Sequence, residues 1–515
     1  MKKNLIKILN SICALTLLSS TVCAQGNRPV GTWKDFLPYG QVLEVAPADG
    51  RVYARTEFAI FSVITETREL EKHGQIGGLS GSDPTAMAVV PLGTNEGHIL
   101  VVGYSNGNID LLTESGVYNM PDIVNSNLIG DKSIRKIFVE GTKAYLSTGF
   151  GVVVIDVTNI EVSDTWYING QQALLGATGV YSRPNKWVVS TDEGVYEASK
   201  DHPFLSSAEA WTRWNDLPES PSSLVSELCF TSSRIFAHLG DGHTGRLWYS
   251  EEGTWAMLPN WPEDGDKLWG LDERNDTLLV GRCCSVDRYD NQLNLLEEPN
   301  ALGNWMQLRD VEYGLEEENT IWIASRIGGL IRYVPNPVEG GAENAVFAPD
   351  GPENAEVRKL DCWNNNLWFA TGGVDAIWNG SYTDVGVHGM VENNWIDVEN
   401  WDGFNEIPGI RDYIDVSIDP LNPNHVMFAS WEEGLVEVLD GEIVEIYNNT
   451  NSTINEGDFG GSYRTGIGGV DFDKNGNLWF TNAFTNSPLQ VRLADGTFVE
   501  MDLGSTVTSN DNIGG

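Results

Sequence analysis

Basic residues are scarce in this sequence. Its 515 residues include 32 Lys and Arg against 73 Asp and Glu, which gives a formal net charge of −41 at pH 7. A surface of this charge repels the phosphate backbone of nucleic acids and the headgroups of anionic lipids. Nucleic acid is therefore excluded as a partner. The simplest interpretation of the acidity is solubility, ahead of a specific cation-binding role.

Long apolar runs are absent after the N-terminus, so no membrane-spanning helix is predicted. The N-terminus itself has the form of an export signal. Lys2, Lys3 and Lys7 precede an apolar stretch from Ile8 to Leu18, and Val22-Cys23-Ala24 is typical of a signal-peptidase site. We expect a signal peptide at 1–24 and a protein exported to the periplasm or the outer-membrane surface. A lipoprotein anchored through Cys23 is the alternative, although Ser20 and Val22 depart from that pattern.

Cysteine is rare for an exported chain. Cleavage after Ala24 leaves Cys229, Cys283, Cys284 and Cys362, which form neither a disulfide framework nor paired zinc motifs. Buried free thiols in strands are the favoured interpretation, and one disulfide between distant units stays open.

Amphipathic helical patterns are also lacking, and a β-repeat takes their place. A short apolar strand with a large residue at its second position recurs every 42 to 59 residues, usually before a Gly or polar turn and a second strand. The ten anchors are Tyr53, Leu100, Tyr145, Trp187, Phe236, Leu279, Trp322, Trp368, Met427 and Trp479. This period is typical of propeller blades. The sequence predicts an all-β fold, with a seven-bladed β-propeller followed by a partial second propeller of three blades.

The predicted boundaries follow from a second element, a Trp-containing outer strand late in many units. GTWKDFLP at 31–38 has this form but no inner strands precede it, so it is expected to complete the blade of Trp322 and close the first ring. The first propeller is placed at 31–336, a Pro- and Gly-rich linker at 337–356, and the incomplete second propeller at 357–515. We expect the polypeptide 25–515 to aggregate through the bare face of its last blade, and 25–336 to be a stable monomer.

Candidate metal sites in the sequence are weak. His238, Asp241 and His243 surround a Gly-rich turn in HLGDGH, which is more typical of a hairpin than of a metal site. Asp471, Asp473, Asn475 and Gly476 match the first half of a calcium loop, but Asn482 stands where that loop needs Glu. Asn475-Gly476 also favours a two-residue turn, which is the preferred interpretation.

Other candidate residues have simpler explanations. Asp276-Thr277-Leu278 fits a tripeptide that some exported bacterial proteins glycosylate, yet it begins a predicted strand. Trp211, Trp214, Trp255 and Trp261 could stack on sugar rings, although packing between blades is favoured. No nucleophile–base spacing, H-E-x-x-H, phosphate loop or G-x-S-x-G motif is present. We predict no catalytic, cofactor-binding or metal-binding residues, and expect a screen of glycan, peptide and ester substrates to show no turnover.

Several stretches resemble the PorZ family of β-propeller proteins of the type IX secretion system. They are GTWKDFLPY at 31–39, VVGYSNGNIDLL at 101–112, and AYLSTGFGVVVIDV at 144–157 followed by DTWYI. EIYNNTNS at 445–452 and DKNGNLWFTN at 473–482 resemble the more widely shared blade consensus of two-component-regulator propellers.

The resemblance implies two propellers followed by a small β-sandwich sorting domain. It also implies a place at the outer face of the outer membrane, with a sortase-like protease, a barrel protein and a further component. That assembly attaches secreted cargo to anionic lipopolysaccharide, which the family is thought to bind and present without catalysis. The sorting domain and the end of the second propeller are missing from this sequence, which suggests a truncated piece of a longer protein.

Two other functions stay open. The chain could be the periplasmic sensor region of a two-component regulator, which predicts a membrane helix and a kinase downstream. It could also be a propeller that binds or cleaves polysaccharide, which predicts acids, or a His/Tyr/Arg set, converging at one funnel mouth. The acidity of the chain suits an anionic sugar ligand poorly, so binding would need a bridging cation or a local basic spot.

Overall fold

The computed structural model describes residues 33–504, except 94–96, 171–173, 241–243, 283–284, 298–306, 317–318, 337–340, 353–354, 384–385, 393 and 399–409. These residues are almost entirely β-structure, with only the short helices η1 (Gln75–Gly77), α2 (Asp122–Asn125) and η2 (Ala208–Ala210) among them. None of the described helices has the length and apolar character needed to cross a bilayer. The predicted all-β propeller class is confirmed.

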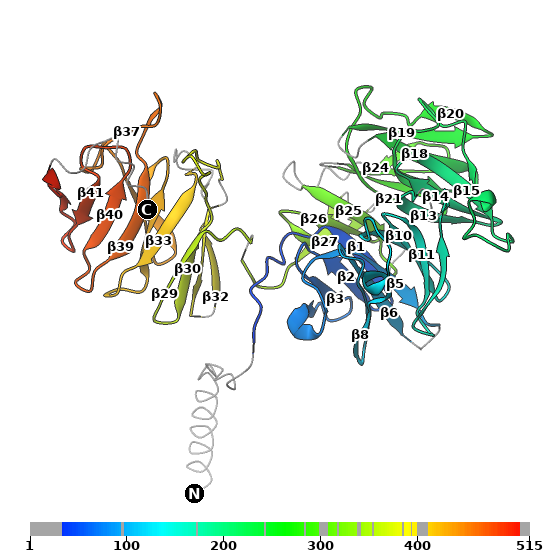
Figure 1. Cartoon of the computed structure of the whole chain (residues 1–515), viewed down its shortest axis with the longest axis horizontal. Coiled ribbons are helices and arrows are strands. Elements are labelled where there is room, and N and C mark those ends of the chain that lie inside the picture. The colour runs from blue at the N-terminus through cyan, green and yellow to red at the C-terminus, as the bar shows by residue number, and fades with distance from the viewer. Residues whose placement is uncertain are drawn as a thin grey trace, which may run out of the picture. The chain divides into compact units, whose positions relative to one another are not determined.

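Seven four-stranded antiparallel sheets follow one another between Glu44 and Phe347 in the described residues (Figure 1). The strands of the first four sheets are β1 Glu44–Ala48, β2 Arg51–Arg55, β3 Ile60–Ile64, β4 Leu70–His73; β5 Pro84–Pro91, β6 His98–Tyr104, β7 Ile109–Thr113, β8 Gly116–Met120; β9 Ile134–Glu140, β10 Lys143–Thr148, β11 Gly151–Asp156, β12 Glu161–Trp166; β13 Ala177–Arg183, β14 Lys186–Thr191, β15 Gly194–Ser199 and β16 Thr212–Arg213. Those of the next three are β17 Val225–Phe230, β18 Arg234–Gly240, β19 Gly245–Glu251, β20 Thr254–Met257; β21 Leu268–Arg274, β22 Thr277–Arg282, β23 Val286–Tyr289, β24 Leu295–Glu297; β25 Leu308–Tyr313, β26 Ile321–Ser325, β27 Gly329–Asn336 and β28 Gly341–Phe347.

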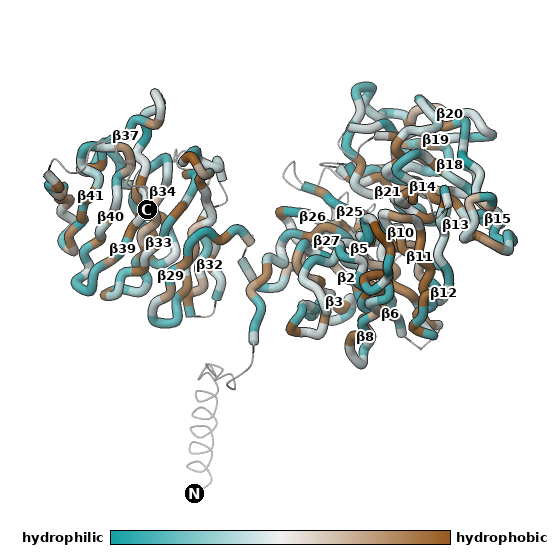
Figure 2. The backbone as a smooth tube through the Cα atoms, in the orientation of Figure 1, coloured by the Kyte–Doolittle hydropathy of each residue, from teal (hydrophilic) through white to brown (hydrophobic). Residues whose placement is uncertain are grey.

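The first strand of each sheet is its inner strand, and these seven strands close a ring. Each inner strand contacts the inner strand of the following sheet, and β25 contacts β1. The core therefore consists of layers between neighbouring sheets. Successive apolar residues of a middle strand face opposite layers, as in β11, where Val153 and Ile155 pack in one layer and Val152 and Val154 in the next. Figure 2 shows the brown segments that these strands contribute to the interior of the ring.

The ring closes differently from the sequence prediction. The outer strand of the sheet that contains Trp322 is β28, which pairs with β27 from Leu330↔Phe347 to Asn336↔Gly341. Trp33–Pro38 lie in no strand, and Trp33 is 82% exposed. The expectation that 31–38 forms this outer strand is wrong, and so is the interpretation of all of 337–356 as a linker.

The segment after Pro38 still belongs to the closing seam. The Tyr39 ring is fully buried among side chains of the first and seventh sheets, and the Val42 N–H donates to the Ser325 carbonyl at 3.0 Å. The N-terminal segment thus fills the space between two sheets instead of extending one of them.

The second array is formed by residues 359–500. Three four-stranded sheets and one two-stranded hairpin are described there. Their strands are β29 Lys359–Trp363, β30 Asn366–Ala370, β31 Val387–Val391, β32 Asn394–Val398; β33 Tyr413–Ile418, β34 His425–Ser430, β35 Gly434–Leu439, β36 Glu442–Tyr447; the hairpin β37 Gly457–Asp458 and β38 Tyr463–Arg464; and β39 Ile467–Phe472, β40 Leu478–Asn482, β41 Leu489–Arg492, β42 Phe498–Glu500. The inner strand β29 contacts β33, and β33 contacts β39.

Candidate functional site

The channel of the first ring holds a cavity of about 360 Å³ at the end where the inner strands begin. Six of the seven inner strands have a β-bulge near their start, where one residue falls out of the pairing register. The residues skipped by the register are Thr85, Arg135, Thr178, Ser226, Trp269 and Arg309. A bulge bends the strand and redirects its side chain. Four of these residues, Thr85, Arg135, Trp269 and Arg309, line the cavity.

Trp269 is the aromatic element of this mouth, and two cations flank it. The Lys267 Nζ lies 3.9 Å from the ring centroid and the Arg309 guanidinium carbon 4.2 Å from it. Cation–π contacts of this kind hold basic side chains in place without neutralising them. Two basic side chains therefore lie beside Trp269, although the chain as a whole is strongly acidic.

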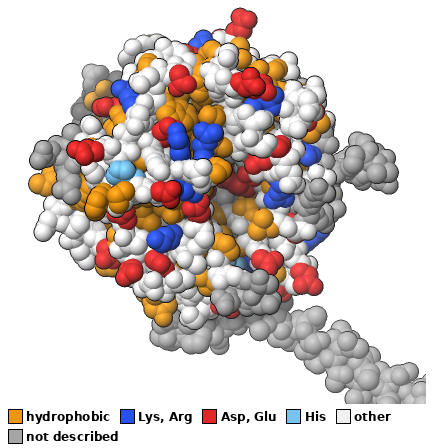
Figure 3. All heavy atoms as spheres, turned by 90° about the vertical axis from the view of Figure 1, so that its right-hand side faces the viewer, with side chains coloured by type: hydrophobic (Ala, Val, Ile, Leu, Met, Phe, Trp, Pro, Cys, Tyr) orange, Lys and Arg blue, Asp and Glu red, His pale blue; other side chains and the backbone are white. Residues whose placement is uncertain are grey.

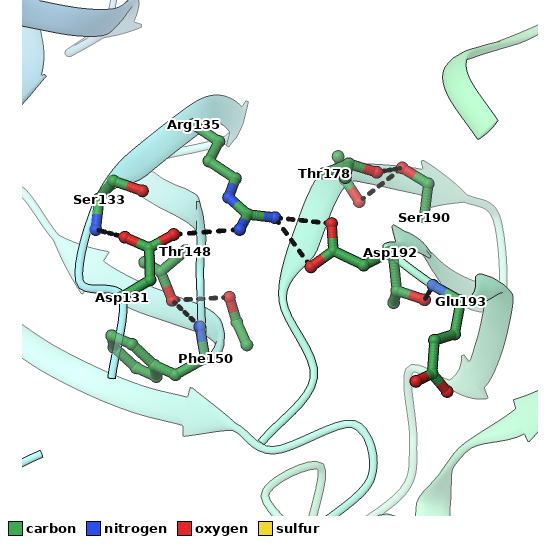
Figure 4. A network of polar contacts seen from close by, with 12 residues as sticks. Asp131, Ser133, Arg135, Thr148, Phe150, Thr178, Ser190, Asp192 and Glu193 are labelled. Carbon is green, nitrogen blue, oxygen red and sulfur yellow. Dashed lines mark hydrogen bonds and ion pairs between the residues drawn. The ribbon is translucent and has the colours of Figure 1, made fainter. Parts of the chain in front are cut away.

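Arg135 is held by two carboxylates from neighbouring sheets (Figure 4). Its Nη2 lies 3.1 Å from Asp131 Oδ2, and its Nη1 lies 2.9 Å from Asp192 Oδ1. Asp131 precedes β9, and Asp192 lies in the turn between β14 and β15. A side chain at Gly176 would displace the ion pair, because its Cβ would overlap Asp192 Oδ2 and Arg135 Nη1. Arg135 thus joins two blades at the mouth, and its charge is largely balanced.

Deeper in the channel, acids and bases pair with each other. Lys136 Nζ lies 2.5 Å from Glu227 Oε1, and Arg55 Nε lies 2.6 Å from Glu44 Oε2. Burial lowers the pKa of Lys136, but the adjacent Glu227 carboxylate outweighs it and raises this pKa above its ordinary value. Figure 3 shows the same mixture of acidic and basic side chains on the outside, on a face that is hollowed near its middle.

Two channel carboxyls have strongly raised pKa values. Burial raises the pKa of Asp310 to about 7. Burial, and then the Asp272 carboxylate, raise the pKa of Glu312 well above its ordinary value. A raised carboxyl pKa is common in catalytic acids, so its cause decides what it means here.

The position of Asp310 recurs in other blades and explains this carboxyl as a structural group. Its Oδ2 accepts the N–H of Val45 in the next blade at 2.9 Å. The same acceptor contact joins Asp272 to Tyr313, Asp361 to Ile418 and Asp415 to Val470. We call this contact the inter-blade clamp. Sequence analysis missed it, although the acid near the start of LRDVEY and YIDVSI was a visible signal.

The predicted metal candidates are structural where the structure describes them. His238 is fully buried, with Nδ1 2.6 Å from Ser226 Oγ and Nε2 3.3 Å from the Asp266 carbonyl oxygen, and burial lowers its pKa. Asp241 and His243 lie outside the described residues. The described side chains include no group of three or more His, Cys, Asp or Glu suited to a metal ion.

The half calcium motif is a turn, as predicted, but five residues, 473–477, connect the paired ends Phe472 and Leu478 instead of the expected two. Asp473 Oδ1 accepts the N–H groups of Asn475 at 2.8 Å and Asn477 at 3.0 Å. Gly476 has a φ of +79°, a left-handed conformation that suits glycine. Asn482 is fully buried and bonds to the backbone of Asn455, so it belongs to the core.

The tryptophan candidates pack between blades. Trp211, Trp214 and Trp261 are buried, and each donates its indole N–H, to the Leu205 carbonyl, Glu197 and the Gly245 carbonyl respectively. Trp255 packs, half-buried, against the same layer as Trp214. The packing interpretation is confirmed for these four side chains.

The remaining candidates divide. Asp276 accepts two bonds from Ser232 at 2.7 Å, and Leu278 is buried, while glycosylation at Thr277 stays a prediction. Cys229 is buried and free as expected, and burial raises its pKa. Cys362 is free but exposed, which corrects the expectation of a buried thiol. Cys283 and Cys284 lie outside the described residues.

Residues 52–212 match the family model of the PorZ N-terminal β-propeller domain of the type IX secretion system. Over these residues the chain is similar to PorZ. The matched residues cover most of the first four sheets of the ring, including the strands that carry Thr85 and Arg135. No curated protein matches this chain.

Solved structures share the fold of this chain. One is PorZ, described as an essential bacterial surface component of the type IX secretion system of Porphyromonas gingivalis, with a TM-score of 0.73 and 22% identity. The match covers 92% of this chain and 60% of that one, so the chain spans about three fifths of the length of that PorZ. Another is an ancestral GH74 enzyme, with a TM-score of 0.62, 12% identity and coverage of 91% and 69%. Identities this low show the fold alone.

Proposed function

We propose that the chain is a non-enzymatic surface component of the type IX secretion system. It binds anionic lipopolysaccharide and the other proteins of the attachment complex, including a sortase-like protease and an outer-membrane barrel protein. The match of residues 52–212 to the PorZ N-terminal propeller carries this proposal. The export signal predicted at 1–24 agrees with a place at the cell surface.

The channel mouth supplies the local basic spot that an anionic ligand needs. Arg309 and Lys267 flank Trp269 and supply the positive charge, while the charge of Arg135, which borders the same cavity, is balanced by Asp131 and Asp192. A phosphate or carboxylate at this position would receive charge-assisted hydrogen bonds from the guanidinium. The strongly acidic remainder of the surface repels an anionic ligand, so its contact with the chain is confined to these basic side chains.

The non-enzymatic character rests on the role of the channel acids. Asp272 and Asp310 each accept a backbone N–H of the following blade, and the same clamp occurs in the second array. A carboxyl that holds two blades together has its oxygens committed to backbone donors. Burial between blades therefore accounts for the raised pKa of Asp310 without a catalytic role.

Deletion of the gene in the native bacterium tests the cellular role. We expect secreted cargo to appear in the medium without attached lipopolysaccharide, and the wild-type gene to restore attachment. Unchanged cargo attachment in the deletion strain would contradict the proposal.

Binding of purified lipopolysaccharide from the same bacterium tests the ligand. We expect the mature chain to bind it with and without EDTA, and Arg309→Ala to weaken binding by about tenfold, the usual worth of a charged hydrogen bond. Arg183→Ala removes the same charge from the far end of β13 and should have no effect. Loss of binding in EDTA would favour a bridging cation over the basic spot, and no binding at all would refute the ligand.

A further inference from the structure

A second cavity of about 420 Å³ lies within the second array and is lined almost wholly by polar side chains. Its lining is formed by Tyr382, Glu432, Glu433, Asn448, Asn449, Glu456, Ser462, Tyr463, Arg464 and Thr465. Three of these residues belong to the hairpin β37–β38 or its turn, which lies between two four-stranded sheets and is an addition to the blade pattern. An addition that borders a cavity points to a binding role, because connecting segments on a rigid scaffold commonly carry function.

Two tyrosine rings stand exposed at this cavity. Tyr463 on β38 is 65% exposed and Tyr382 is 58% exposed. Tyr382 has a φ of +59°, which is unfavourable for a side chain of its size. The fully buried Asp412 holds it there by accepting the N–H groups of Tyr382 at 2.9 Å and Thr383 at 3.1 Å. The two hydrogen bonds to the buried Asp412 carboxylate offset the unfavourable backbone conformation of Tyr382. This conformation keeps the Tyr382 ring outside the core.

The polar side chains between the tyrosines are already oriented. Arg464 forms an ion pair with Glu432, and Asn449 Nδ2 donates to Glu456 Oε1 at 2.9 Å. These pairs fix the side chains but leave further donors and acceptors, since a carboxylate has about four acceptor positions and an amide has donors and an acceptor. Burial, and then the Glu432 carboxylate, raise the pKa of Glu433 above its ordinary value.

The chemistry of this lining fits an uncharged, hydroxyl-rich ligand. Three glutamates against one arginine disfavour an anion, and a cavity with so little apolar lining offers a peptide side chain nothing to bury. Hydroxyl groups can both donate to carboxylates and accept from amides. The apolar C–H face of a sugar ring can pack on an exposed tyrosine ring.

We propose that this cavity binds neutral saccharide units, with Tyr382 and Tyr463 packing against sugar rings and Glu433, Asn449 and Glu456 bonding their hydroxyls. This site is separate from the channel mouth of the first ring and takes an uncharged ligand. It therefore goes beyond the proposed binding of anionic lipopolysaccharide. The saccharide could come from the neutral part of a surface polysaccharide or from a free glycan.

Titration of the mature chain with neutral hexasaccharides tests the site. The probes are α-glucan, β-glucan, mannan and galactan hexaoses, screened by saturation-transfer NMR and measured by calorimetry. We expect at least one to bind, and Tyr463→Ala and Tyr382→Ala each to weaken binding by about tenfold. Tyr463→Phe keeps the ring and should retain most of the affinity. Tyr118→Ala removes a ring that is 53% exposed from β8 of the first ring and should change nothing.

Two results would overturn the inference. One is that none of the hexaoses binds, and the other is that binding survives both tyrosine-to-alanine changes in proteins with an unaltered thermal midpoint. Binding of the delipidated polysaccharide distinguishes the two sources. Its loss in the tyrosine variants supports the site with a surface polysaccharide as ligand, and its retention, with loss of hexaose binding, supports the site with a free glycan. Lipopolysaccharide binding without any hexaose binding leaves the proposed function standing and refutes this site.

Discussion

The inner strands β1 and β29 have a similar residue pattern, but a neighbouring sheet covers β1 and none of the described sheets covers the corresponding face of β29. Each has an acid near its start, Glu44 and Asp361, followed by Val45 and Cys362 respectively. Val45 is 4% exposed because the seventh sheet of the ring covers it. Cys362 is exposed, and its neighbours Leu360 and Trp363 are 60% and 50% exposed. The first array is closed on itself, whereas no sheet among the described residues covers the corresponding face of β29.

The difference does not lie in how one blade joins the next. The inter-blade clamp joins Asp310 to Val45 in the ring and Asp415 to Val470 in the second array, with oxygen–nitrogen distances of 2.9 and 3.2 Å. Matched tryptophans, Trp322 and Trp368, are buried against the following blade in both arrays. The same contacts therefore join neighbouring blades in both arrays. Closure of the ring adds the burial of the outer face of its first blade.

The largest expected effect is on association. Exposed Leu360 lies on the same face of β29 as Cys362, and no described sheet covers that face, so the polypeptide 25–515 should self-associate, while 25–352, which retains β28, should be monomeric. The change Leu360→Ser should shift 25–515 toward monomer in size-exclusion chromatography with light scattering. Ile327→Ser, at an exposed position of the ring, is the control. Equal behaviour of both proteins would show that the β29 face is not the cause.

The next largest effect is on the seams themselves. Trp322→Ala should cost the ring about 3–5 kcal/mol of unfolding free energy through the cavity it leaves, and Trp368→Ala should cost the second array a similar amount. Trp322 also donates its indole N–H to Glu316 at 2.9 Å, so its loss should be the greater. Urea unfolding of both variants measures the loss of unfolding free energy. A larger loss for Trp368→Ala than for Trp322→Ala would contradict this prediction.

The clamp should have a smaller effect with a pH signature. Asp310→Ala leaves the Val45 N–H without its acceptor and should cost about 1–3 kcal/mol. The pKa of Asp310 is about 7 in the folded chain, against about 4 when unfolded. The folded state therefore holds a proton that the unfolded state has lost, so this group's contribution falls as pH rises from about 4 to about 7.

Asp310→Asn, which is neutral at every pH, should remove this part of the pH dependence. Urea unfolding of the ring at pH 5 and pH 8 measures it. An identical fall in stability in the wild type and the variant would assign the dependence to another group.

The smallest effect is expected at the turn of the half calcium motif. Gly476→Ala forces an alanine into a left-handed conformation and should cost about 1 kcal/mol. Added calcium should leave the thermal midpoint of the second array unchanged, because backbone N–H groups already occupy the Asp473 carboxylate. A clear rise of the midpoint in calcium, absent in Asp473→Asn, would restore the calcium interpretation.

The inner and second strands of each blade were predictable, because large apolar anchors recur at a fixed spacing. Trp322 and Trp368 are among them, and both are buried as that pattern implies. The outer strands were less predictable, since one face of each is solvated. In β28, Val346 is 60% exposed and no Trp marks the strand. The backbone pairing of β28 with β27 has no sequence signature. For this reason the sequence predicts the wrong outer strand for the blade of Trp322 and a linker at the residues of β28.

The candidate site was hidden for a related reason. A bulge adds one residue to a strand without changing its composition, so Arg135, Trp269 and Arg309 look like ordinary strand residues in the sequence. Their convergence on one mouth depends on the ring, which brings inner strands from distant parts of the chain together. Tyr463 was likewise invisible, because only the fold shows that its hairpin borders a cavity.

Thiol reactivity at β29 tests most directly whether one array is closed and the other open. The mature chain is alkylated in its native state, and each cysteine is followed by peptide mass spectrometry, with Val45→Cys as the matched position in the ring. We expect Cys362 to react at a rate close to that of the urea-unfolded chain, while Cys229 and the thiol at position 45 react only as the ring unfolds. Protection of Cys362 as strong as that at position 45 would show that the β29 face is covered and would contradict the account.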